Sequence, residues 1–392
     1  MLQTNVARPP ITADQLRTFD VPGPRYTSYP TADRFVEAFG AEQMEQALRQ
    51  RHAKVAAIPT PLSIYVHIPF CEALCYYCAC NKIITRQHDR AWPYLRALAQ
   101  EIDLYAEHLG GNQPVAQLHL GGGTPTFLQD GELASLMDKL RQKFQFAPGG
   151  EFAVEVDPRT VDAARLATLA RLGFNRLSFG VQDFDPAVQK AVHRVQSQTQ
   201  VFACVEAARD LGFESVNLDL IYGLPLQTPE SFRRTLDTVI ELRPDRIALY
   251  AYAHLPERFK PQRRIDALSL PSAETKVSML ASSIAMLTEA GYEYVGMDHF
   301  ALPDDALAVA KRQGRLHRNF QGYSTQPDCD LIGLGVSAIG RMGVTHGQNA
   351  KTLPEYYDLL SQNRLPVVRG VSLSRDDLVR RAVIMGIMCQ GL

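Results

Sequence analysis

The chain lacks the features that mark membrane, secreted and nucleic-acid-binding proteins. No uninterrupted apolar run in its 392 residues approaches the ~20 residues that a helix needs to span a bilayer. Residues 1–20 contain no basic segment followed by an apolar stretch, so no signal peptide is expected. An excess of one sign of charge is also missing, because the formal net charge is only −1. These absences predict a cytoplasmic protein with no nucleic-acid or membrane partner.

The chain also lacks a disulfide framework, since its seven cysteines are spread too unevenly. Four of them, Cys71, Cys75, Cys78 and Cys80, lie within ten residues in the segment CEALCYYCAC. Thiolates at this density bind iron–sulfur clusters or zinc. No second C-x-x-C or H-x-x-x-H pair is present to complete a zinc site, which favours a cluster. Three cysteines in the C-x3-C-x2-C pattern can hold three irons of a cubane and leave the fourth iron open for reaction.

From residue 62 onward, short apolar segments alternate with amphipathic helical patterns. Strands rich in β-branched and aromatic residues are expected at 62–70, 115–120, 152–156, 176–182, 215–223 and 246–253. Helices are expected over 91–109 with Gly110 as the stop, over 131–144, and after Thr228 as an N-cap. Six such units predict a parallel sheet with right-handed crossovers. Because eight would close a full barrel, the predicted α/β fold is an incomplete (β/α)6 barrel, open along one side.

The expected organisation has four parts. They are an N-terminal arm and helix (1–55), the partial barrel (56–260), a region completing the barrel on the substrate side (261–370) and the start of a C-terminal helical domain (371–392). The Pro-rich run VPGPRYTSYPTADRF should be extended and cross the open side of the barrel. A further helix should begin at Ser374–Asp377. It carries apolar residues that nothing later covers, so we expect the C-terminal domain to be truncated.

Functional side chains of such barrels lie at the carboxyl ends of the strands. The unusual residues of this sequence occur there: the cysteines, the turn Gly121–Thr126, Glu155, Gln182 and Asp219. The turn either lets a ligand approach bare backbone or is an ordinary strand exit, and it lacks the Gly-Lys-Ser/Thr of a phosphate loop. Glu155 and Asp219 are carboxylates in apolar strands, which are costly to bury without a partner. That partner could be a structural Arg or Lys, or a bound sulfonium, amine or ribose hydroxyl.

The C-x3-C-x2-C pattern after the first strand of a six-strand barrel resembles the radical S-adenosylmethionine superfamily. Longer segments resemble the oxygen-independent coproporphyrinogen III oxidases (coproporphyrinogen dehydrogenases), among them GPRYTSYPTADRF, YVHIPFCEALCYYCACNKIITR, LHLGGGTPTFL, EVDPRT, NLDLIYGLPLQTPESF and LHRNFQGYSTQ. The resemblance runs from about residue 20 to the end. It implies an oxidoreductase of haem biosynthesis that converts two propionates of coproporphyrinogen III into vinyl groups, giving protoporphyrinogen IX.

The resemblance also implies the cofactors and the residues that hold them. In this family a [4Fe–4S] cluster cleaves S-adenosylmethionine, and the resulting 5′-deoxyadenosyl radical takes a hydrogen atom from the propionate. The cluster would be held by Cys71, Cys75 and Cys78, with Cys80 nearby. Two S-adenosylmethionines are implied; the first would be met by Tyr65, Gly122, Glu155 and Ile339. The second would be met by Tyr77, Gly123, Thr124, Gln182, Arg194, Asp219 and Ala253. An unidentified electron donor, an electron acceptor and a monomeric state complete the expectation.

Some residues depart from the family pattern, and other functions compete with the oxidase. Tyr77 stands where phenylalanine is common, and Ala79 where glycine is common. One alternative is a haem-trafficking relative that keeps the cluster and the barrel but acts as a carrier. Such relatives typically have an aromatic residue at the position of Cys80 and lack the GPRYTSYPT segment, so this sequence favours the oxidase. A zinc-binding barrel without catalysis is the alternative from another class.

Overall fold

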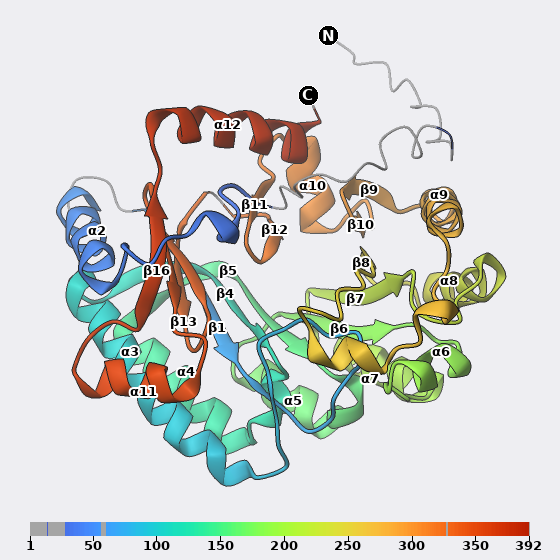
Figure 1. Ribbon diagram of the computed structural model, residues 1–392, viewed down its shortest axis with the longest axis horizontal. Coiled ribbons are helices and arrows are strands. Elements are labelled where there is room, and N and C mark those ends of the chain that lie inside the picture. Colours follow the sequence, from blue (N-terminus) through green and yellow to red (C-terminus); the bar gives the residue numbers. More distant parts are fainter. Residues whose placement is uncertain (1–13, 15–27, 56–59, 327, 392) are drawn as a thin grey trace.

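The computed structural model describes residues 14, 28–55, 60–326 and 328–391. Residues 21–27 of the expected Pro-rich arm, among them Arg25, Tyr26 and Thr27, lie outside these ranges. A large curved sheet forms the centre of the molecule, and most of the helices lie on its outer side (Figure 1). Within the described ranges, no helix has both the length and the apolar character needed to cross a membrane.

Six parallel strands follow one another along this sheet in chain order. They are β1 (Leu62–Ile68), β4 (Gln113–Gly122), β5 (Phe144–Val156), β6 (Arg176–Gln182), β7 (Ser215–Tyr222) and β8 (Arg246–Ala251). Strands β1 and β7 are buried on both faces, because helices cover the outside and side chains fill the inside, and this explains their near-continuous apolar sequences. All six expected strands are confirmed, and with them the partial barrel.

Helices connect the parallel strands and flank the sheet. The α-helices are α2 (Ala41–Val55), α3 (Ala91–Leu109), α4 (Asp130–Lys143), α5 (Ala163–Arg171), α6 (Pro186–Ala191), α7 (Gln198–Asp210), α8 (Pro229–Leu242), α9 (Ala273–Glu289), α10 (Ala306–Arg312), α11 (Leu353–Ser361) and α12 (Arg375–Gln390). Short 3-10 turns are η1 (Ala32–Arg34), η2 (His88–Arg90), η3 (Pro125–Phe127), η4 (Pro158–Thr160), η5 (Lys260–Arg264) and η6 (Ala267–Ser269).

The expected helix boundaries are confirmed where capping chemistry marked them. Gly110 ends α3 in the left-handed region at φ 79°, and the Thr228 side chain accepts a hydrogen bond from the Ser231 amide at the start of α8. Helix α4 ends one residue earlier than expected, and Phe144 is the first residue of β5.

The sheet extends beyond the six strands on both sides, which the sequence did not indicate. On the β1 side it continues through β13 (Asp330–Leu334), β14 (Ile339–Met342), β15 (Thr345–Asn349) and β16 (Val367–Ser372). On the β8 side it adds β10 (His299–Ala301) and β9 (Glu293–Gly296). Only β13 joins in parallel, beside β1; the others are antiparallel. These strands are short and several carry polar residues, as in THGQN of β15, so they show no apolar run that marks a strand.

Two small ribbons lie outside the large sheet. One pairs β2 (Phe70–Cys71) with β3 (Ile83–Ile84), and the other pairs β11 (His317–Asn319) with β12 (Gly322–Ser324). The first closes the base of the loop that carries the cysteines. Because all the parallel strands run the same way, this loop and the other strand exits meet at one rim of the barrel.

A buried carboxylate joins helix α3 to the segment that contains β13, β15 and helix α11. Glu101 is fully buried, and one of its oxygens accepts from the Gly335 amide at 2.7 Å and the Tyr356 hydroxyl at 2.6 Å. The other accepts from Asn349 Nδ2 at 2.7 Å. Burial raises the pKa of Glu101 to about 7, although these three donors oppose the rise. Segments more than 230 residues apart in sequence therefore meet at one side chain.

We expect Glu101→Gln to lower the free energy of unfolding by about 1–3 kcal/mol, the cost of leaving a buried polar group unsatisfied. All three partners are donors, so the new amide NH2 would face another donor. Asn349 cannot flip to compensate without losing its 2.8 Å bond to the Gly335 carbonyl. Urea unfolding followed by circular dichroism measures the change. Glu107→Gln, on the exposed face of the same helix, is the matched control; equal stability of both variants would contradict the argument.

The described end of the N-terminal arm packs against the last helix. The Tyr29 hydroxyl donates to Asp377 Oδ1 at 2.7 Å and accepts from Arg34 Nη1 at 3.0 Å. Ser374 caps α12 as expected, through a capping box with Asp377. Helix α12 exposes much of its apolar surface, at Leu378, Val379, Val383 and Ile387.

Candidate active site

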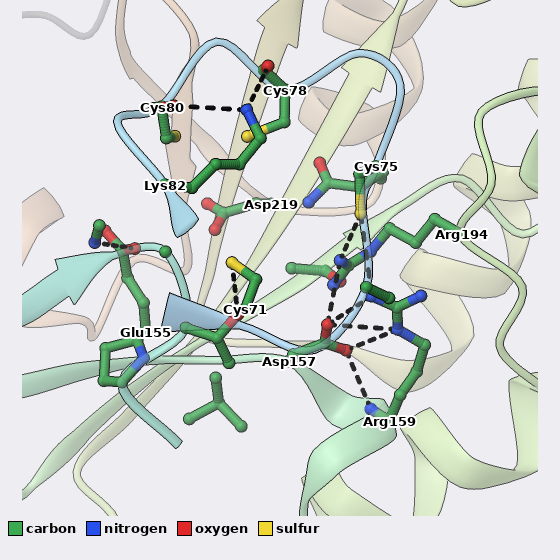
Figure 2. Close-up of a pocket in the computed structure, with 18 of the residues that line it drawn as sticks. Cys71, Cys75, Cys78, Cys80, Lys82, Glu155, Asp157, Arg159, Arg194 and Asp219 are labelled. Carbon is green, nitrogen blue, oxygen red and sulfur yellow. Dashed lines mark hydrogen bonds and ion pairs between the residues drawn. The ribbon is translucent and has the colours of Figure 1, made fainter. Parts of the chain in front are cut away.

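The cysteine loop leaves β1 and returns through β3 at the rim of the barrel. The Ile83 amide donates to the Pro69 carbonyl at 2.7 Å, and the Thr85 amide to the Cys71 carbonyl at 2.9 Å, so the base of the loop is closed. All four cysteines of the loop are free thiols and line one cavity of about 270 Å³ (Figure 2). The loop therefore brings the C-x3-C-x2-C thiols to the carboxyl end of the sheet.

Hydrogen-bond donors surround the thiols. Thr124 Oγ1 donates to Cys71 Sγ at 3.4 Å, and Arg194 Nη1 donates to Cys75 Sγ at 3.5 Å. Burial raises the pKa of the Cys71 thiol to about 11, whereas the hydrogen bond with Cys80 lowers the pKa of the Cys78 thiol to about 6. Donors and positive charge near sulfur stabilise thiolates, the form in which cysteine binds iron.

The grouping of ligands bears on the choice between a cluster and a single metal ion. Among the residues that the structure describes, no three His, Cys, Asp or Glu side chains are gathered as one metal ion would need. A cubane is less demanding, because each thiolate binds a different iron and the sulfurs need not converge on one point. Three free thiols around one cavity therefore fit a cluster better than a tetrahedral zinc site.

The turn after β4 is shaped by close packing within the protein. Gly122 has φ 112°, and a Cβ at this position would lie 2.6 Å from the His67 ring. At Gly123 a Cβ would lie 2.8 Å from the backbone of Pro69 and Phe70. Both glycines also line the cavity with the cysteines. Glycine is required at both positions because neighbouring segments of the protein occupy the space of a side chain. Without side chains, the backbone of these two residues forms part of the cavity wall.

Neither of the two expected carboxylates pairs with Arg or Lys in the described part of the chain. Glu155 accepts from His119 Nε2 at 3.1 Å and from the Gly122 amide at 3.2 Å. Burial acts to raise the pKa of Glu155, but the interactions with His119 and Gly122 outweigh it and hold the pKa below its usual value. The structural ion pair considered for this residue is thus absent from the described residues, and its carboxylate is charged.

Asp219 is held by neutral donors from β6 and from its own strand. Ser178 Oγ donates to one of its oxygens at 3.0 Å and Asn217 Nδ2 to the other at 2.9 Å. Burial, with the nearby charge of Glu155, raises the pKa of Asp219 to about 7. A carboxylate offers about four acceptor sites, so Asp219 can still accept hydrogen bonds from a ligand in the cavity.

A second cavity, of about 280 Å³, adjoins the first, and Glu155 lines both. Tyr65 and Ile339 line this second cavity with His67, and the three come from β1 and β14. His67 Nε2 donates to the Asn81 carbonyl at 2.9 Å, because a carbonyl can only accept. Its Nδ1 must therefore accept from the Tyr65 hydroxyl, at 3.0 Å. Neutral His67 thus links Tyr65 to the end of the cysteine loop.

An ion-pair group beside Cys75 was only partly anticipated. Asp157 binds Arg159 Nη2 at 2.6 Å and Arg194 Nη1 at 3.2 Å. Arg159 Nη2 also donates to Cys75 Sγ at 3.8 Å. Arg194 was expected in the site, but Asp157 and Arg159 were missed, although they follow β5 in the quoted EVDPRT segment. Arg194 Nε is buried and has no hydrogen-bond partner among the described residues, as expected of a donor that awaits a ligand.

The remaining expected residues divide between the cavity and its surroundings. Tyr77, Thr124 and Gln182 line the first cavity, and Gln182 has the unusual φ of 70° for a non-glycine residue. Ala253 lines neither of these two cavities and is exposed. Its carbonyl accepts from Gln262 Nε2, which also donates to the Tyr77 carbonyl at 3.0 Å. Ala253 is therefore tied to the site through Gln262 and the Tyr77 backbone.

Comparison with known proteins agrees with this geometry. The family model of the Radical SAM superfamily matches residues 65–239, from β1 into α8, and so covers the cysteine loop and most of the parallel strands. The fold and the site define a radical S-adenosylmethionine protein.

The relatives identify the family more closely. The chain is 52% identical over 379 residues to an oxygen-independent coproporphyrinogen III oxidase of Pseudomonas aeruginosa, covering 96% of this chain and 82% of the relative. It is 51% identical over 375 residues to the protein of that name in Escherichia coli, covering 95% of this chain and 80% of the relative. A solved structure of the Escherichia coli coproporphyrinogen III oxidase matches with a TM-score of 0.89 at 51% identity, covering 93% of this chain and 83% of that chain. The chain belongs to the oxygen-independent coproporphyrinogen III oxidase family.

We expect Cys71→Ala, Cys75→Ala and Cys78→Ala each to abolish the cubane, since each thiolate would hold one iron. Cys80→Ala should still assemble a cluster, with lower activity. Iron and sulfide content and the electron paramagnetic resonance of the reduced protein, all under anaerobic conditions, measure the outcome. Cys329→Ala removes a free cysteine that lines neither cavity and serves as the control. A full reducible cluster in Cys78→Ala would show that the ligand set is wrong.

Proposed function

We propose that this chain catalyses the oxygen-independent oxidative decarboxylation of coproporphyrinogen III to protoporphyrinogen IX. The observation that carries the proposal is the meeting of three free thiols with Glu155 and Asp219 around one cavity. It occurs in a chain more than half identical, over nearly its whole length, to relatives named for that activity.

The cluster would be held by Cys71, Cys75 and Cys78. We propose two S-adenosylmethionines around Glu155, which lines both of the adjoining cavities. The first would lie against Tyr65, Gly122, Glu155 and Ile339. The second would lie against Tyr77, Gly123, Thr124, Gln182, Arg194, Asp219 and, at the outer edge, Ala253. The unpartnered Arg194 Nε and the free acceptor sites of Asp219 suit polar groups of such a ligand.

When bound, the cluster and the cofactor supply a carbon-centred radical that takes a hydrogen atom from the substrate. Removal of one hydrogen atom from the propionate β-carbon, release of carbon dioxide and transfer of one electron to an acceptor leave a vinyl group. The same change occurs at a second propionate. The electron acceptor and the donor that reduces the cluster come from outside the chain.

The protein's own residues prepare this chemistry electrostatically. The charged Glu155 faces the space where a cationic cofactor would lie, and Arg159 and Arg194 face Cys75. Opposite charges fixed before binding cost no reorganisation when the cofactor arrives.

One anaerobic assay tests the proposal. Cluster-loaded protein is mixed with coproporphyrinogen III, S-adenosylmethionine and a reductant, and the product mass is measured. We expect the loss of two carbon dioxide units with formation of 5′-deoxyadenosine. Tight binding of haem without conversion of coproporphyrinogen III would instead indicate a carrier and overturn the proposal.

We expect Asp219→Asn to weaken S-adenosylmethionine binding by about 1–3 kcal/mol, because a charged acceptor is lost. The pKa of Asp219 is about 7, so its carboxylate is protonated below neutral pH. Wild-type affinity should therefore fall as pH drops from 8 to 6, more steeply than in the variant, which retains only the titration of the cofactor's own amine. Calorimetry on cluster-loaded protein at several pH values measures both effects. Asp237→Asn, on the exposed side of α8, is the control; identical pH profiles in wild type and Asp219→Asn would contradict this role.

A further inference from the structure

Two cations from neighbouring strands lie beside the second cavity. Arg369 lies in β16, and Lys351 follows the end of the adjacent strand β15. Arg369 Nε donates to Gln348 Oε1 at 2.7 Å, and Gln348 Nε2 donates to the carbonyl of Ser337 at 3.0 Å. Ser337 lines the cavity that also contains Tyr65 and Glu155. Arg369 is therefore connected to the cavity wall through one side chain.

A second set of contacts leads from Arg369 to the same cavity. The guanidinium lies 5.8 Å from the centre of the Phe35 ring, and Phe35 meets Phe320 edge to face at 6.2 Å. Phe320 lines the cavity. Strand β16 and the turn η1 that precedes Phe35 are in contact (Figure 1). Buried Phe35 thus links Arg369 to Phe320, the aromatic side chain at the cavity wall.

Lys351 is tied by its backbone to both the cysteine loop and the cavity. Its carbonyl accepts from Asn81 Nδ2 at 3.0 Å, and Asn81 is the residue whose carbonyl receives the His67 hydrogen bond. The preceding residue, Ala350, accepts from the Ser337 amide at 2.7 Å. The ammonium group itself is exposed and makes no side-chain hydrogen bond within the described residues.

Neither cation forms an ion pair within the described residues. Partial burial lowers the pKa of Lys351, and the positive charges of Arg369 and of Arg258, in the exposed turn after β8, lower it further. The positive charge of Arg369 and Lys351 is therefore left to attract an anion.

We propose that Arg369 and Lys351 form a site for a carboxylate of the substrate, which receives a propionate of the tetrapyrrole while the macrocycle lies against Phe320. This inference rests on the proposed function, which supplies a substrate with four propionates. The planar guanidinium group can bind a carboxylate through two parallel hydrogen bonds, and the lysine adds a point charge. The aromatic ring suits the apolar ring system that joins the propionates.

The test compares coproporphyrin III with its tetramethyl ester, which has the same ring system but no carboxylate charge. Affinities for the cluster-loaded protein are measured by fluorescence quenching under anaerobic conditions. Lys351→Gln and Arg369→Gln should each weaken binding of the acid by about threefold, as expected for exposed charge pairs. The double variant should lose about tenfold. Affinity for the ester and for S-adenosylmethionine should not change.

Two matched variants separate the site from general charge effects. Arg233→Gln removes one positive charge from the exposed side of α8, away from the cavity, and should bind the acid as wild type does. Lys351→Arg keeps the charge and should retain affinity. Lys351 makes no side-chain hydrogen bond within the described residues, so its variants test the site even if Arg369→Gln, which loses the bond to Gln348, fails to fold.

Three outcomes would overturn the inference. Variants that bind the acid no more weakly than Arg233→Gln would make the cations ordinary surface charges. Equal weakening for acid and ester would assign them to packing, and loss of S-adenosylmethionine affinity alone would assign them to the cofactor's carboxylate. Turnover of coproporphyrinogen III by wild type is measured in parallel. If wild type converts it and the variants bind normally, this inference alone fails; if wild type does not, the proposed function fails with it.

Discussion

Glu155 carries a negative charge in the interior of the barrel, where a charge is stable only with donors around it. One of those donors is the Gly122 amide, so the carboxylate fixes the turn that ends β4. The same turn positions the cysteine loop, because the amides of Gly123 and Thr124 donate to the carbonyls of Ile68 and Phe70. Thr124 Oγ1 also donates to the Cys71 thiol. The position of the first cysteine therefore depends on how the charge of Glu155 is satisfied.

Positively charged side chains lie near the other cysteines of the same loop. Arg194 and Arg159 share Asp157, yet both still reach Cys75 Sγ. Burial acts against the charged form of Asp157, but the two arginines outweigh it and hold its pKa below the usual value. Lys82 adds a further positive charge, donating to the Cys78 carbonyl. Thiolates that bind iron are anionic, so positive charges held in place beside them lower the cost of assembling a cluster in a buried cavity.

The sequence predicted what depends on local pattern and missed what depends on distant contacts. Apolar runs revealed the six strands, and Gly110 and Thr228 marked helix ends, because each signal lies within a few residues. The antiparallel strands β14–β16 carry no such signal, since their place is fixed by packing against α2 and by distant contacts such as Asn349 with Glu101 of α3. No local pattern singled out the cations Lys351 and Arg369, for the same reason. The sequence likewise could not show that the His67 ring and the backbone of Pro69 and Phe70 fill the space beside Gly122 and Gly123.

Acidic and basic side chains are distributed unevenly around the two cavities, and this distribution bears on the proposed reaction. Glu155 and Asp219 place acidic groups at the cavity walls, whereas Arg369 and Lys351 are connected to the wall of the second cavity through Gln348 and Ala350. A tetrapyrrole with four carboxylates is attracted by those cations, and a cationic cofactor is attracted by the acids. Each decarboxylation turns an anionic propionate into a neutral vinyl group, which removes one charge that the cations could hold. In the proposed reaction each decarboxylation therefore weakens this attraction, and the product, with two carboxylates fewer, is bound less strongly than the substrate by the same residues.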